Sequence, residues 1–336
     1  TEIMINGQSD IFLERDGKIT RWDKTFENET RLEDIAQKIA ALSNKIVNAS
    51  VPIADTRLED GSRVSIVLPP IALNGPVITI RKFYREPLTM EKLIGLNSIT
   101  REAAEFLEYA VRAKYNIFIS GGTGSGKTTF LNALSGFIPK DERVITIEDS
   151  AELQIEHVEN LVRLEARDAN IEGKNAVKIR DLIRASLRMR PDRIIVGEVR
   201  GEETLDMVQA MSTGHDGSLS TGHGNSPKDM AARLETMILM GMDMPVSAIR
   251  QQLSSAIDII VHLGRLRDKT RRVLQIVEIK GINKGEIEFN TLFEFKETGE
   301  KEGRITGSLT ASGRGLVNCE KMYAAGFRMG TAQHTI

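Results

Sequence analysis

Residues 121–128 have the types and spacing of a phosphate-binding loop. They read GGTGSGKT and directly follow the apolar run at 116–120. Glycines let the backbone turn so that successive N–H groups point inward, and a following helix adds its positive N-terminus to this anion site. Lys127 is placed to contact β- and γ-phosphates, and Thr128 supplies the hydroxyl that such a loop places on magnesium. The loop therefore predicts a site for a nucleoside triphosphate and Mg²⁺.

We expect the whole loop and the first residue after it to contact the nucleotide. These residues are Gly121, Gly122, Thr123, Gly124, Ser125, Gly126, Lys127, Thr128 and Thr129. The alternative is a glycine-rich turn without a ligand. An apolar strand pattern before the loop and a helical stretch at 129–135 favour the phosphate site over that alternative.

Two acidic residues end apolar stretches that follow the loop. Glu148 closes the run at 145–147 and is placed to order magnesium and water, although a helix-capping or solvated acid would have the same local pattern. Glu198 closes the run at 194–196, where a Walker B strand would place Asp and Glu together. Gly197 stands at the Asp position, which leaves Glu198 to polarise the attacking water unless it is merely a strand-end acid.

Residues 213–227 are rich in glycine and contain His215 and His223. Neither cysteines nor carboxylates accompany them at zinc-site spacing, so we expect no zinc here. His223 precedes Ser226–Pro227, a typical helix start, and is placed to hydrogen-bond a γ-phosphate or to stay a satisfied polar residue.

Composition limits the class of protein. The chain has 336 residues, 40% of them hydrophobic, which predicts two domains. With 45 basic and 47 acidic residues and 5% aromatics, it has no general basic field or stacking platform, so direct nucleic-acid binding is not expected.

The single cysteine, Cys319, excludes a disulfide framework and a four-cysteine zinc module and fits a reducing cytosol. No apolar run approaches a membrane span, and the start lacks a signal peptide and an initiator Met, so we expect a soluble fragment.

The first 83 residues read as strands with one helix. We expect a hairpin from 10–14 and 18–22 around Asp16–Gly17, and strands at 57–59, 63–68 and 77–83. Thr30 and Glu33 form a capping-box pattern. The apolar stripe expected on that helix consists of Leu32, Ile35, Ile39, Leu42 and Ile46. The stretch 84–100 lacks sustained periodicity and is interpreted as a linker.

From residue 101 helical segments alternate with short apolar strands, which predicts a parallel sheet covered by helices. The expected strands are 117–119, 144–147, 194–196 and 218–220. A terminal antiparallel sheet is expected from 257–263, 273–279 and 286–289. Residues 298–314 are expected to be mobile, and 331–336 carry no signal. Methionines between 230 and 244 are interpreted as core packing.

Four segments occur in an order that resembles the type II and type IV secretion ATPases. Residues 121–128, 146–149, 197–198 and 221–223 resemble the Walker A loop, Asp box, atypical Walker B motif and His box of that family. The agreement includes residues 1–7, 55–64 and 78–83 and is greatest with the CpaF-type branch, which drives assembly of tight-adherence (Flp/Tad) pili. The resemblance implies an α/β fold, with a RecA-like P-loop NTPase domain at 101–336 and a smaller α+β domain, an antiparallel sheet plus helices, at 1–83.

The resemblance also implies roles for individual residues. ATP is expected between the two domains, with Arg57, Arg63 and Arg81 reaching phosphates of the same or a neighbouring subunit. Guanidinium groups bind phosphate oxygens bidentately, although surface solvation would equally explain these arginines. Magnesium is expected on Thr128 and, through water, on Glu148.

In the same implied mechanism Glu198 orients the water, and His223 and the arginines report loss of the γ-phosphate to the first domain. Arg200 is interpreted as an intersubunit contact or a salt bridge. Gly224 stands where relatives often have alanine, which is expected to loosen the backbone without removing His223.

The implied assembly is a homohexamer at the cytoplasmic face of the inner membrane, bound to polytopic platform proteins. A conjugative or effector type IV secretion ATPase is the alternative that shares most motifs. A DNA translocase is less favoured because no basic stripe is present, and the type II branch because the zinc cysteines are missing. A small-molecule kinase would need a carboxylate-bearing lid, and a non-hydrolysing binding module would need an inert Glu198.

Overall fold

A computed structural model describes residues 2–15, 18–82, 87–167, 169 and 174–327. The chain divides into two compact units, Thr1–Glu86 and Pro87–Ile336. In the described parts of both, no helix combines the length and apolar character needed to cross a membrane.

The first unit is an antiparallel sheet covered on one face by a helix. Its strands are β1 (Glu2–Asn6), β2 (Asp10–Arg15), β3 (Lys18–Arg21), β4 (Ile53–Arg57), β5 (Arg63–Val67) and β6 (Val77–Arg81), in the order β3-β2-β1-β6-β5-β4. Helix α1 (Glu29–Leu42) buries Leu32, Ala36 and Ala40 in a core shared with strand residues such as Ile66 and Ile78. Alternate residues of each strand face this core, and the residues between them lie on the opposite face of the sheet.

The sequence-based description of α1 is wrong in two details. Asn28, not Thr30, caps the helix, because its side chain accepts a hydrogen bond from the Arg31 N–H at 2.7 Å. The helix ends at Leu42, so Leu42 and Ile46 are exposed, and small alanines make the closest contact with the sheet. The predicted hairpin of β2 and β3 is confirmed, with Asp16 and Gly17 themselves outside the described residues.

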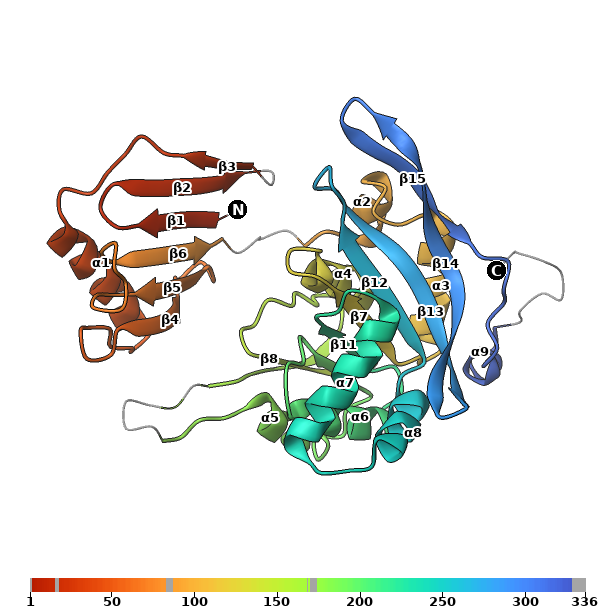
Figure 1. Ribbon diagram of the computed structural model, residues 1–336. Helices are drawn as coiled ribbons and strands as arrows, with labels where there is room; N and C mark the ends of the chain where they lie inside the picture. The colour runs from red at the N-terminus through yellow and green to blue at the C-terminus, as the bar shows by residue number, and fades with distance from the viewer. Residues whose placement is uncertain (1, 16–17, 83–86, 168, 170–173, 328–336) are drawn as a thin grey trace. The chain divides into compact units, whose positions relative to one another are not determined.

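The second unit contains a nine-stranded mixed sheet, shown in Figure 1. Its strands are β7 (Ile117–Gly121), β8 (Arg143–Glu148), β9 (Asn160–Glu165), β10 (Arg193–Val196), β11 (Leu219–Gly222), β12 (Ile259–Arg265), β13 (Arg271–Asn283), β14 (Glu286–Lys301) and β15 (Arg304–Ala311). They are ordered β15-β14-β13-β12-β7-β11-β10-β8-β9. The four predicted parallel strands are confirmed, and β9, a polar edge strand, was missed.

Helices cover both faces of this sheet. They are α2 (Met90–Gly95), α3 (Arg101–Arg112), α4 (Lys127–Ser135), α5 (Ile179–Ser186), α6 (Glu203–Ser212), α7 (Pro227–Gly241), α8 (Val246–Ala256) and α9 (Glu320–Ala324). Neighbouring residues of β7 enter different cores: Ile117 and Ile119 pack with α3 and α4, whereas Phe118 packs with α6, α7 and α8. This alternation follows from a strand that is buried on both faces.

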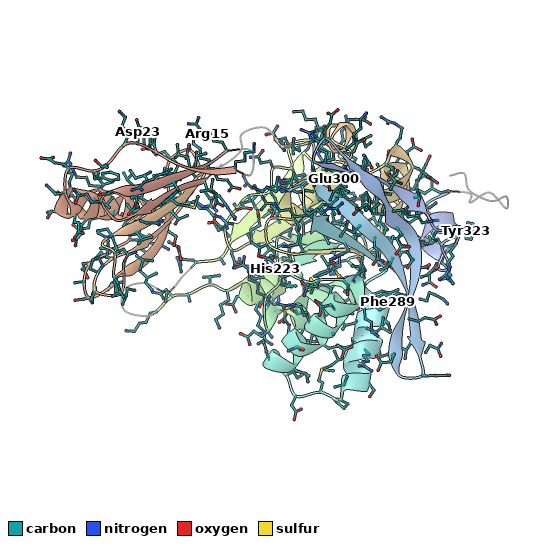
Figure 2. The ribbon with its side chains drawn as sticks, turned by 45° about the horizontal axis from the view of Figure 1, so that its top comes forward. Arg15, Asp23, His223, Phe289, Glu300 and Tyr323 are labelled. Carbon is teal, nitrogen blue, oxygen red and sulfur yellow. The ribbon has the colours of Figure 1, made fainter. Side chains whose placement is uncertain are left out.

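Two further expectations need correction. The expected linker contains α2, capped by Thr89, whose buried Met90 and Leu93 join the core of the second unit. The stretch expected to be mobile lies in the β14–β15 hairpin; of the two β14 residues labelled in Figure 2, Glu300 lies near the C-terminal end of the strand and Phe289 near its N-terminal end. The antiparallel arrangement expected of the C-terminal strands is confirmed, and the pairing of β12 with β7 joins them to the central sheet. Residues 331–336 lie outside the described part of the chain.

The predicted methionine packing differs along α7. Met230 and Met237 are buried, whereas Met240 and Met242 are exposed at the end of the helix. Core packing is therefore confirmed for Met230 and Met237, and the partly buried Met244 packs against the same core.

A buried carboxylate holds the C-terminal segment against β13. Glu278, 1% exposed, accepts hydrogen bonds from the backbone N–H of Val317 and Asn318 and from the Asn290 amide. We expect Glu278→Gln to lower the free energy of unfolding by about 2 kcal/mol, because hydrogen bonds to a charged group are lost and an amide NH₂ faces N–H donors.

Urea unfolding followed by circular dichroism measures this change. The matched control is Glu288→Gln, which removes an exposed ion pair to Lys280 on the neighbouring strand and should change the free energy by about 0.5 kcal/mol or less. Equal effects of the two substitutions would contradict the assigned role of Glu278.

Candidate active site

The phosphate-binding loop joins β7 to α4 at the carboxyl edge of the parallel strands. The strand–loop–helix arrangement predicted from the sequence is confirmed. Gly126 is the N-terminal cap of α4 with φ of +94°, a left-handed conformation that favours glycine. Gly122, Thr123 and Gly124 are exposed, so the backbone that would contact phosphate is open to solvent.

Lys127 lies at the centre of a polar cluster. Its side chain is 8% exposed, and Nζ lies 3.4 Å from the Gly122 carbonyl oxygen, 3.4 Å from His223 Nδ1 and 3.7 Å from Glu198 Oε1. Burial lowers the pKa of Lys127, and the Glu198 carboxylate opposes that shift. Lys127, Glu198 and His223, all predicted from the sequence as site residues, follow three different strands and therefore lie together.

Glu198 Oε2 accepts hydrogen bonds, whereas the buried Oε1 has close neighbours but no aligned hydrogen-bond donor among the described residues. Arg200 donates to Oε2 from Nη2 at 2.6 Å and from Nε at 2.9 Å, and His223 Nε2 lies 3.0 Å from Oε1. Arg200 Nη1 is also 3.5 Å from Asp149, so the structure favours the salt-bridge interpretation of Arg200. The cluster holds Glu198 with Oε1 on the side of Lys127.

His223, labelled in Figure 2, follows β11 and precedes α7. Burial lowers the pKa of His223, and the Glu198 carboxylate opposes this in part. A neutral ring with its proton on Nε2 leaves Nδ1 to accept a hydrogen bond from the Lys127 ammonium and keeps the Nε2 proton on the side of Glu198 Oε1, 3.0 Å away. This tautomer is therefore compatible with both neighbours.

Glu148 explains the glycine in the atypical Walker B segment. A Cβ added at Gly197 would lie 3.0 Å from Glu148 Cγ, so the aspartate usual at that position would be tightly packed against the Glu148 side chain. Glu148 is 3% exposed, and Oε2 accepts the N–H groups of Glu152 and Leu153 at 2.7 and 3.0 Å. Burial raises the pKa of Glu148.

The donor set fits magnesium only together with a nucleotide. Among the described residues no group of three or more His, Cys, Asp or Glu side chains is arranged to hold a metal ion alone. Glu148 Oε1 is buried and finds no hydrogen-bond partner in the described part of the chain. An unpartnered carboxylate oxygen suits a water of a hydrated magnesium ion, whose other ligands would come from phosphates and Thr128.

Gly224 is explained by packing rather than by backbone freedom. The residue is buried, and an added Cβ would lie 3.0 Å from the Met230 Cβ on the first turns of α7. Close contact between the His223 loop and α7, not a looser backbone, accounts for the missing side chain.

The predicted arginines of the first unit form one row. Cross-strand pairing places Arg57 opposite Arg63 and Arg63 opposite Arg81, on β4, β5 and β6. Arg81 Nε also contacts Glu2 Oε1 at 2.8 Å. The register therefore gathers three arginines on adjacent strands of one sheet.

Sequence reasoning missed the arginines beside the turn of the β12–β13 hairpin. Arg265 and Arg271 are cross-strand partners, and Arg271 Nε donates to the Gly124 carbonyl oxygen at 2.8 Å. The pairing of β12 with β7, where Leu263 lies opposite Gly121, brings these arginines to the loop. Clustering of basic residues at 265–272 was the only available sequence signal.

We expect Arg271→Gln to raise KM for ATP about fivefold with kcat within about twofold, because a contact that orients the loop equally before and during reaction contributes uniform binding. Steady-state hydrolysis at varied ATP measures both constants. Arg267→Gln is the matched control, because Arg267 lies on the same hairpin but bonds Glu297 and Glu300 instead. A fall in kcat at unchanged KM would contradict this role for Arg271.

Known proteins resemble the chain over most of its length. The model of the family described as type II/IV secretion system protein matches residues 1–326. A Mycobacterium tuberculosis protein named for conjugal transfer is 34% identical over 287 residues, covering 83% of this chain and 81% of that protein. PtlH of Bordetella pertussis, a type IV secretion system protein, is 34% identical over 303 residues, covering 82% of this chain and 89% of PtlH.

The X-ray structure of the Yersinia pseudotuberculosis ATPase DotB matches with a TM-score of 0.60 and 18% identity, over 82% of this chain and 75% of that one. At that identity the likeness concerns the fold, and it confirms the expected α/β class. Together with the matched relatives and the complete phosphate-binding loop, the family match shows that the chain belongs to the type II/IV secretion system protein family and is an ATPase.

Proposed function

We propose that the chain is the subunit of a hexameric ATPase that powers assembly of a Flp/Tad-type pilus. The observation that carries the catalytic part is the convergence of Lys127, Glu198 and His223 beside the phosphate-binding loop. A buried cation, a held carboxylate and a neutral imidazole at one strand edge are the groups that phosphoryl transfer to water requires.

Each residue of the cluster has a distinct proposed role. Lys127 exchanges its contact with Glu198 for the β- and γ-phosphates, which frees Glu198 Oε1 to accept a hydrogen bond from water. Arg200 keeps the other oxygen occupied, so the carboxylate stays oriented. His223 then responds to the γ-phosphate through the Lys127 ammonium, which its Nδ1 contacts. When bound, magnesium would neutralise phosphate charge, with Thr128 and Glu148 as the residues that hold it.

The row of Arg57, Arg63 and Arg81 is proposed to contact phosphates of a nucleotide bound by the same or a neighbouring subunit. Its support is the cross-strand register, which places the three arginines at paired positions on neighbouring strands. Planar guanidinium groups suit bidentate phosphate binding and neutralise charge in the transition state.

For its place of action we propose the cytoplasmic face of an inner membrane, through polytopic platform proteins. No membrane-spanning helix is found in the described residues, so attachment through partners accounts for work at a membrane. Direct binding of nucleic acid is not proposed.

A conjugative or effector secretion ATPase is the second candidate. It is favoured by the names of the relatives, one assigned to conjugal transfer and one to type IV secretion. The catalytic proposal is common to both candidates, which differ only in what the ring assembles with.

Two measurements test the proposal. Particle mass with and without ATP and magnesium should show a six-subunit species that hydrolyses ATP, and a monomer without turnover would contradict it. Source cells lacking the chain should lose surface pili in electron micrographs and regain them with the wild type but not with the Glu198→Gln variant. Loss of DNA or protein transfer with pili retained would establish the second candidate instead.

A further inference from the structure

A single polar residue interrupts the buried apolar stretch of β12. Ile259, Ile260, Val261 and Leu263 are apolar and at most 5% exposed, whereas His262 between them is 6% exposed. A buried imidazole is unfavourable unless its nitrogens are hydrogen-bonded, and an aliphatic side chain would pack there without that requirement.

Both sides of the His262 ring are engaged. Nδ1 lies 2.8 Å from Ser120 Oγ, and the backbone of Asn225 lies close enough to the ring to affect its pKa. That backbone favours the protonated form of the ring, which is the effect of a carbonyl group facing a ring N–H. Burial lowers the pKa of His262, so the ring is neutral at neutral pH and Nδ1 accepts from the Ser120 hydroxyl.

These two partners belong to the two halves of the active site. Ser120 directly precedes the phosphate-binding loop, and Asn225 lies two residues after His223. Ser120 is paired with Gly222 on β11 and with His262 on β12, so the three positions form one row across neighbouring strands. His262 thus connects the strand that carries the loop with the segment that carries His223.

The same two segments meet a second time at Lys127 and His223. Lys127 Nζ and His223 Nδ1 are 3.4 Å apart, and His223 Nε2 is 3.0 Å from Glu198. The contact between His262 and Ser120 lies in the row of strand residues that comes just before the phosphate-binding loop and before His223 along the chain. A side chain that fixes both segments at their bases restricts how far their ends can separate.

We propose that His262 is a positioning residue that sets the distance between the phosphate-binding loop and His223. The inference rests on the proposed role of His223 in hydrolysis. His262 contacts Ser120 and is not one of the residues of the Lys127, Glu198 and His223 cluster. It acts through His223, whose alignment affects Glu198 during the reaction more than it affects binding of ATP in the ground state.

The test compares kcat and KM in two variants that remove the Ser120–His262 bond. His262→Phe keeps the ring volume, and Ser120→Ala removes the bond from the other side. We expect kcat to fall about tenfold in His262→Phe and about threefold in Ser120→Ala, with KM for ATP within about twofold in both. Ser186→Ala is the matched control, since Ser186 is equally buried but bonds Ile183 in α5, and it should keep the wild-type kcat.

A double-mutant cycle with His223→Ala separates positioning from stability. If His262 acts through His223, His262→Phe should lower kcat by less than about twofold in the His223→Ala background. Full additivity of the two substitutions would overturn the inference, as would a rise in KM with kcat unchanged. Should His262→Phe fail to fold, Ser120→Ala carries the same cycle.

The cycle also distinguishes the two levels of the proposal. If the His223→Ala variant hydrolyses ATP at the wild-type rate, the role of His223 itself is contradicted, and with it the inference. If turnover depends on His223 but the effects of His223→Ala and His262→Phe on kcat are additive, the proposed function is retained and the positioning role is rejected.

Discussion

Replacement of Glu198 by glutamine is expected to lower kcat for ATP hydrolysis about 10³-fold, because a positioned general base contributes about 10²–10⁴-fold. Glutamine has nearly the same volume, and its amide oxygen can still accept from Arg200, so the fold and particle mass should not change. Turnover at saturating Mg-ATP, with particle mass recorded on the same samples, measures the effect. ATP affinity should stay close to that of the wild type, since the change removes a base rather than a phosphate ligand.

Glu202→Gln is the matched control for that substitution. It makes the same chemical change four residues further along, where Glu202 bonds Lys178 and Arg180 outside the Lys127 cluster. Its kcat should stay within about twofold of the wild type, as surface substitutions away from a site generally do. Unchanged turnover in Glu198→Gln would refute the assigned base and make Glu148 the next candidate.

A second large effect is expected from Lys127→Gln. Lys127 is buried beside Glu198, so its loss leaves that carboxylate and the incoming phosphates without their nearest ammonium group. We expect ATP affinity to fall about 100-fold, because removal of one partner of a buried charge contact costs about 2–5 kcal/mol. Titration with a fluorescent ATP analogue in the presence of magnesium measures the dissociation constant directly.

Lys114→Gln provides the comparison. Lys114 precedes the opposite end of β7, and its ammonium group makes only a half-exposed contact with Glu142 at 3.8 Å. Its removal should leave affinity within about twofold, consistent with the small contribution of exposed ion pairs. Binding by Lys127→Gln at wild-type affinity would mean that the loop does not hold the phosphates.

The phosphate-binding loop and its flanking strand and helix were predictable from the sequence because their determinants are local. Glycine supplies the turn, the apolar run supplies a buried strand, and both lie within a few residues of Lys127. The other parallel strands were predictable for the same reason, since continuous apolar runs mark strands buried on both faces. Locality also explains the failure at 298–314, where β14 and β15 are stabilised by each other and not by an apolar pattern of their own.

The sequence by itself determined which residues are chemically competent, and the tertiary structure decided which of them meet. Lys127 and His223 are 96 residues apart and are joined by the pairing of β7 with β11, while Arg271 reaches Gly124 across 147 residues through β12. No local pattern encodes strand order or register, because these depend on which distant surfaces bury each other. For the same reason Ser120 and His262 read as ordinary polar residues in the sequence, and only the folded sheet places them in contact.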